Sequence, residues 1–80
     1  MLNEIDKIQA DLELLKDRTH YDSNVMIKMQ TEDLLIKALD IKRILKEMHA
    51  DQMYIKKIQS IINQIEQFLL DLEDMIDLNI

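Results

Sequence analysis

The sequence contains neither glycine nor proline in its 80 residues, and this absence limits the possible folds more than any other feature. Tight hairpin turns and phosphate-binding loops depend on positive backbone φ angles, which glycine adopts at the least cost. The strongest helix breakers are also missing, since proline costs about 3 kcal/mol and glycine about 1 kcal/mol in a helix interior. We therefore predict an all-α fold built from long helices.

The composition is that of a small chain that folds. Hydrophobic residues make up 48% of the sequence and charged residues 32%, which is too apolar for a disordered segment. A chain of 80 residues forms at most one domain, 1–80, with a limited core. Because it has no cysteine for disulfides and no evident structural metal site, we expect self-association to contribute to its stability.

Hydrophobic periodicity predicts three helices, at about residues 3–18, 24–49 and 52–78. The first has apolar residues on one face, at Ile5, Ile8, Leu12 and Leu15. The polar run 17–24 is rich in residues that favour turns and caps, so we place a connection there. Thr31 is a possible further N-cap within the second helix. The last helix carries an apolar band over roughly 160° of its surface, which is too wide for one neighbouring helix to cover.

The junction at residues 49–51 allows two architectures. A turn there, with Asp51 as N-cap, gives a helical hairpin or a three-helix bundle. Without a turn, one helix runs from about residue 31 to 78. The continuous helix is supported by a seven-residue repeat of apolar positions, typical of coiled coils, at Leu34, Ile41, Met48, Ile55, Ile62, Leu69 and Ile76.

The distribution of charge favours the turn. Residues 1–24 have six acids and three bases, residues 25–57 have five and seven, and residues 58–80 have five and none. The acidic last helix is therefore attracted to the basic middle one, although single surface pairs contribute only about 0–1 kcal/mol. Folding it back should bring Glu66, Asp71, Asp74 and Asp77 near Lys37, Lys42, Arg43 or Lys46.

The residues expected to form the main packing surface are apolar side chains of the last two helices. The central seam consists of Ile58, Ile62, Ile65, Phe68, Leu69 and Leu72, packed opposite Ile41, Ile44, Leu45 and Met48. A seam of this kind favours coiled-coil-like helix packing. We expect a small regulatory or structural protein that binds a protein partner or forms a homodimer. The five internal methionines are expected to fill the core, with an adaptable binding groove as the alternative.

Catalytic chemistry is not expected, because most of the residue types that it needs are missing. There is no cysteine nucleophile and no glycine-supported oxyanion or phosphate loop. His20 with Asp22, and His49 with Asp51, are two residues apart, a spacing that points to different faces of a helix and argues against a metal site. We expect no enzyme, no cofactor and no small-molecule substrate.

The acidic last helix suggests an alternative function. Glu66, Asp71, Glu73, Asp74 and Asp77 create a negative field that repels nucleic acid and anionic membranes. Such a helix could inhibit a nucleic-acid-binding protein by covering its basic surface as a DNA mimic does. The sequence shows no secretory signal and no run of about 18 uncharged residues that could span a membrane, so a cytoplasmic location is expected.

Overall fold

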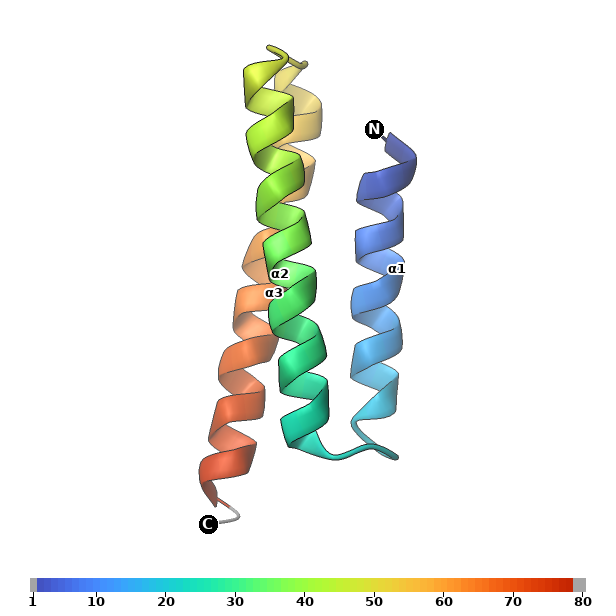
Figure 1. Cartoon of the computed structure of the whole chain (residues 1–80), viewed down its shortest axis with the longest axis vertical. Coiled ribbons are helices and arrows are strands. Elements are labelled where there is room, and N and C mark those ends of the chain that lie inside the picture. The colour runs from blue at the N-terminus through green and yellow to red at the C-terminus, as the bar shows by residue number, and fades with distance from the viewer. Residues whose placement is uncertain (1, 79–80) are drawn as a thin grey trace.

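The fold is a bundle of three helices. A computed structural model describes residues 2–78 of the chain, and the side chains of residues 3–76. The helices α1 (Leu2–Arg18), α2 (Asn24–Glu47) and α3 (Gln52–Leu78) run in alternating directions along the long axis (Figure 1). Each helix contacts both of the others, and the residues described contain no strand. The all-α three-helix bundle is therefore confirmed, and the continuous helix from 31 to 78 is wrong.

The connection between α1 and α2 occupies residues 19–23, inside the polar run. Thr19 Oγ1 donates a hydrogen bond to the Lys16 carbonyl oxygen at 2.7 Å, which satisfies one of the acceptors left open at the end of α1. Ser23 is the N-cap of α2, and its hydroxyl oxygen accepts from the backbone nitrogen of Val25 at 3.2 Å. These local bonds reverse the chain without glycine or proline.

Thr31 lies in the interior of α2, so its possible role as a new N-cap is wrong. Its side chain is fully buried, and Oγ1 donates to the Ile27 carbonyl oxygen at 2.7 Å, four residues earlier. Because that bond satisfies the hydroxyl within its own helix, the threonine can occupy a core position at little cost.

The end of α2 is a Schellman turn in which histidine takes the position usually held by glycine. The backbone nitrogen of Ala50 donates to the Leu45 carbonyl at 2.9 Å, and that of His49 donates to the Lys46 carbonyl at 3.1 Å. His49 has a φ of 54°, in the left-handed region. Ala50 packs against the core, which adds the apolar contact typical of this motif.

The start of α3 follows at once, with Asp51 as its N-cap. One carboxylate oxygen of Asp51 accepts from the backbone nitrogen of Met53 at 3.0 Å, and its carbonyl accepts from that of Tyr54 at 3.0 Å. The predicted turn at 49–51 is confirmed. The C-cap Met48 precedes it, so α2 ends two residues earlier than the sequence pattern predicts.

Replacing His49 with glycine is expected to raise the free energy of unfolding by about 0.5–1 kcal/mol. The left-handed conformation costs a residue with a Cβ atom roughly 1–2 kcal/mol, and glycine avoids this cost. Part of the gain is offset because glycine raises the conformational entropy of the unfolded chain. Urea denaturation followed by circular dichroism measures the change. Ala10→Gly, in the exposed middle of α1, is the control and should cost about 1 kcal/mol. Equal losses in both variants would contradict the left-handed assignment.

The core is a single cluster to which all three helices contribute. α3 supplies its central band, which we call the α3 band and which consists of Ile58, Ile61, Ile62, Ile65, Phe68 and Leu72. The cluster of buried apolar residues comprises Ile5, Ile8, Leu12, Leu15, Ile27, Leu34, Ala38, Leu45, Ile58, Ile61, Ile62, Ile65, Phe68 and Leu72. Its extent over all three helices explains how so short a chain buries so many large side chains.

The two flanks of the α3 band face different helices of the same chain. On one side, Lys57 Nζ lies 2.9 Å from a carboxylate oxygen of Asp6 in α1. On the other, Lys28 Nζ of α2 lies 3.7 Å from a carboxylate oxygen of Glu73. The band thus has the two neighbours that its width requires. Both neighbours belong to this chain, so the width alone does not call for a second molecule.

Candidate protein-interaction surface

Most of the residues predicted to form the packing seam lie inside the bundle. Leu45, Ile58, Ile62, Ile65, Phe68 and Leu72 are buried, and Ile41, Ile44 and Leu69 are half-buried. A partner cannot reach the buried residues while the bundle is closed. Met48 differs from the rest of the set, because it is the C-cap of α2 and is exposed. Any surface that binds a partner must therefore include other residues.

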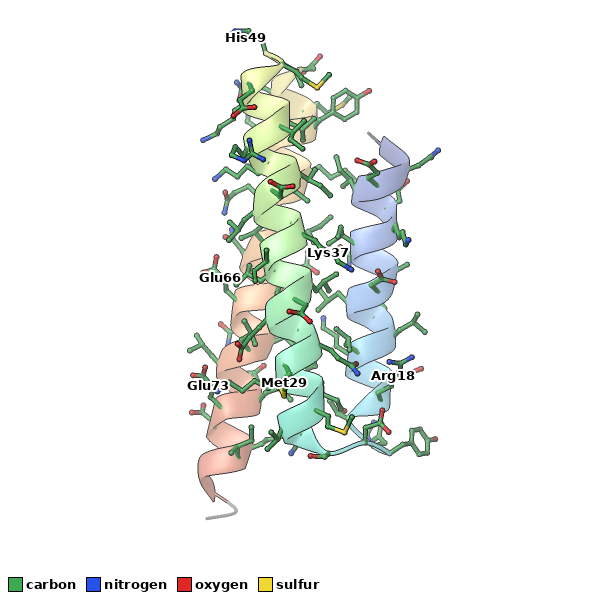
Figure 2. The ribbon with its side chains drawn as sticks, in the orientation of Figure 1. Arg18, Met29, Lys37, His49, Glu66 and Glu73 are labelled. Carbon is green, nitrogen blue, oxygen red and sulfur yellow. The ribbon has the colours of Figure 1, made fainter. Side chains whose placement is uncertain are left out.

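The half-buried Ile41 and Ile44 lie at the bottom of a shallow groove between α1 and α2. Ile8 also lines this groove, and charged side chains from both helices surround it, namely Glu4, Lys7, Asp11, Lys37 and Asp40. Lys37 projects from α2 on the side of α1 (Figure 2). Charges of both signs line the groove, so it offers no strong preference for a charged ligand.

The acidic residues of α3 do not gather on one face. Glu66 and Glu73 lie along the same edge of the bundle (Figure 2), and Glu73 is near Lys28. Asp71 lies toward α1 instead, in a shallow pocket that Lys16 also lines. Asp74 is exposed, and the side chain of Asp77 lies outside those described. Inhibition of a basic partner stays a prediction, and this spread of charge lends it no support.

The acids of α3 also lie beside a different part of α2 from the one predicted. Glu73 approaches Lys28, near the start of α2, while Lys42 donates a hydrogen bond to Gln59. Residues equally distant from the turn at 48–51 face one another in an antiparallel hairpin. The acidic end of α3 therefore meets the first half of α2. Among the described side chains no ion pair joins Glu66, Asp71 or Asp74 to Lys37, Lys42, Arg43 or Lys46, and Asp77 lies outside them.

The outward side of α2 carries a second apolar stripe, which we call the α2 outer face. Its six positions follow one another at alternating spacings of four and three residues, the pattern of a helix-packing seam. They are Val25, Met29, Glu32, Ile36, Leu39 and Arg43, and all six are exposed. Ile36 is 65% exposed and Leu39 46% exposed at the centre of the stripe. These side chains face away from both neighbouring helices.

The outer sides of the other two helices lack such a stripe. On α1 the only exposed large hydrophobic residue among the described side chains is Leu14, and mid-way along α3 it is Leu70. Around Leu70 the outer positions of α3 are polar, at Lys56, Ser60, Asn63, Gln67 and Asp74. Single exposed apolar residues are normal on a protein surface, whereas a contiguous row of them marks an interaction site. The α2 outer face is therefore the candidate functional site.

The polar members of the α2 outer face carry opposite charges. Arg43 forms ion pairs with Asp40 and, at 3.0 Å, with Glu47 on its own helix. Hydrogen bonds first to Asp40 and then to Glu47 hold the pKa of the Arg43 guanidinium above its usual value. Glu32 makes no ion pair with another of the described side chains. A shallow depression on this face, lined by Ile36, Leu39 and Arg43, could receive a side chain from a partner.

The five internal methionines lie on the surface and not in the core. Met26, Met29, Met48 and Met53 are exposed, and Met75 is 38% exposed. Their expected role as core filler is therefore wrong. Met29 belongs to the α2 outer face, and Met26 lies in the first turn of the same helix. Flexible thioether side chains suit a surface that must adapt to a partner.

Metal-ligating side chains do not cluster in the described part of the chain. Between residues 2 and 78, no group of three His, Cys, Asp or Glu side chains is placed to hold a metal ion. Within the same range, no helix has both the length and the apolarity needed to cross a membrane. Comparisons with protein-family models, curated proteins and solved structures find no match to this chain.

Proposed function

We propose that this protein is a helix-binding interaction module, not an enzyme, and that its binding site is the α2 outer face. In this proposal α1 and α3 form the scaffold that keeps α2 helical and rigid. Isolated short helices are only marginally stable in water, so a helix packed along two sides is a better binding element than a free peptide. The site presented in this way needs no rearrangement of the core.

The observation that carries the proposal is the difference between the three outer faces. Among the described side chains only α2 repeats exposed apolar residues at the spacing of a helix-packing seam. Within the same set α1 has Leu14 alone, and the three on α3, Met53, Leu70 and Met75, do not follow that spacing. An amphipathic helix lying along this stripe could bury Ile36, Leu39 and Met29 together. Removal of such side chains from water contributes about 1.5–3 kcal/mol for each that becomes fully buried.

A designed amphipathic peptide tests the proposal. The peptide should carry leucine at heptad positions a and d and be titrated into the isotope-labelled full chain. We expect chemical-shift changes in the NMR spectrum to concentrate on the α2 outer face, at Val25, Met29, Ile36 and Leu39. The interior residue Ile65 should be unaffected, because the peptide does not enter the core.

The matched pair for this experiment is Ile36→Lys and Leu70→Lys. Both residues are exposed in the middle of a long helix, at 65% and 55%, but only Ile36 belongs to the α2 outer face. Ile36→Lys should abolish the peptide-induced shifts, and Leu70→Lys should leave them unchanged. Shifts spread over all three helices, or none at millimolar peptide while the chain is monomeric, would contradict the proposal.

A further inference from the structure

We propose that the occupant of the α2 outer face is a second copy of this chain, bound with its α2 antiparallel. The inference rests on the proposed function and adds the identity, direction and register of the partner. A twofold axis passing between Ile36 and Leu39 places Ile36 of each copy beside Leu39 of the other. Such an interface uses one surface patch twice, as closed dimers do.

The charges of the stripe fit this register. Glu32 lies four residues before Ile36, and Arg43 lies four residues after Leu39. The same twofold axis therefore brings Glu32 of each copy opposite Arg43 of the other, forming two symmetric ion pairs beside the apolar centre. A parallel, in-register pair would instead place Glu32 against Glu32 and Arg43 against Arg43, which repels. The position of the two charges selects the antiparallel arrangement.

The ends of the molecule are also complementary in charge. The tip formed by the α2–α3 turn has five bases and two acids over residues 42–57. The opposite end holds Asp71, Glu73 and Asp74 of α3, together with Asp17 and Asp22 at the end of α1 and in the α1–α2 connection, against the three bases Lys16, Arg18 and Lys28. Antiparallel pairing of α2 sets the basic tip of each copy beside the acidic end of the other (Figure 1 shows the two ends of one copy). Complementary fields of this kind favour the correct orientation.

The length of α2 gives the contact its extent. With 24 residues and a rise of about 1.5 Å per residue, α2 runs for most of the 45 Å long axis. In the proposed register Met29 of one copy meets Lys46 of the other, whose aliphatic stem can cover the thioether while its ammonium group reaches water. The seam therefore continues on both sides of the Ile36–Leu39 centre.

Sedimentation velocity of the full chain over a range of concentrations tests the association. We expect a reversible monomer–dimer equilibrium. Ile36→Lys should weaken the dimer by about 100-fold or more, because both copies lose an apolar anchor and gain a charge at the seam. Leu70→Lys is the matched control and should change the dissociation constant by less than about 3-fold, since isolated surface substitutions have small effects.

Charge reversal and cysteine cross-linking test the register. Glu32→Arg or Arg43→Glu alone should weaken the dimer by about 10-fold, and the double variant should restore it. Because the chain has no cysteine, Ile36→Cys and Leu39→Cys can be mixed, with one of them isotope-labelled. Oxidation should form mixed 36–39 disulfides in preference to 36–36 or 39–39. Circular dichroism confirms that each variant is folded.

Each result separates this inference from the proposed function. A strict monomer whose α2 outer face binds the designed peptide would overturn the homodimer and keep the helix-binding function. A monomer that binds no peptide would overturn both. A dimer that persists in Ile36→Lys, or that cross-links mainly as 36–36, would overturn the proposed surface or its direction.

Discussion

Replacing Ile65 with alanine is expected to lower the free energy of unfolding by about 2–5 kcal/mol. Ile65 is fully buried in the α3 band, which packs against both other helices. The truncation loses apolar burial and leaves a cavity that two packed helices can close only in part. Domains of this size lie at the low end of the usual stability of about 5–15 kcal/mol, so the loss is a large share of the total.

The experiment is a urea denaturation followed by far-ultraviolet circular dichroism. Leu70→Ala, in the same helix but 55% exposed, is the control and should change stability by less than about 0.5 kcal/mol. The difference between the two variants measures burial, because both shorten a large aliphatic side chain in the interior of α3. Similar effects would mean that the band does not form the core of the bundle.

The helices themselves follow from hydrophobic periodicity. Ile5, Ile8, Leu12 and Leu15 share one face by spacing alone, and the structure buries all four. The position of the turn also follows from local chemistry, because Asp51 is a good N-cap residue at a point where the apolar pattern is interrupted. Sequence reasoning could not identify the residue that ends α2, because a histidine with positive φ is uncommon. No glycine or asparagine follows the last apolar position of α2 to mark the end of the helix.

The register of α2 against α3 follows from the position of the turn and not from the net charges of the two helices. Once the turn is at 48–51, counting outward from it places Lys28 opposite residue 71, within two residues of the Glu73 that it approaches. Attraction between net charges gives no such register, because it depends weakly on position and is screened by salt. Geometry therefore outweighs charge in deciding which residues meet.

The candidate site was missed because α2 carries two apolar stripes on opposite sides. Leu34, Ala38 and Leu45 face the core, while Ile36 and Leu39 face outward. Read as one apolar pattern, these residues suggest only a well-buried helix. The signal for the second stripe is the regular spacing from Val25 to Arg43, which becomes meaningful only once the direction of the core is known.

Leu12→Asp is expected to remove most of the folded population, at a cost of about 4 kcal/mol or more. Leu12 is fully buried on the inner side of α1. The substitution adds the penalty for burying a carboxyl group to the loss of apolar contact, and the described residues offer no buried cation to pair with it. The exposed Asp6–Lys57 ion pair is worth too little to hold α1 in place alone.

Leu14→Asp is a close control, because it makes the same substitution two residues further along α1, at a side chain that is 55% exposed. Its stability should stay within about 0.5 kcal/mol of the wild type. Thermal and urea denaturation followed by circular dichroism compare the two, and a dye that binds apolar surface should bind only Leu12→Asp. Equal stability of both variants would show that α1 is not docked, and the α3 band would then need another molecule to cover it.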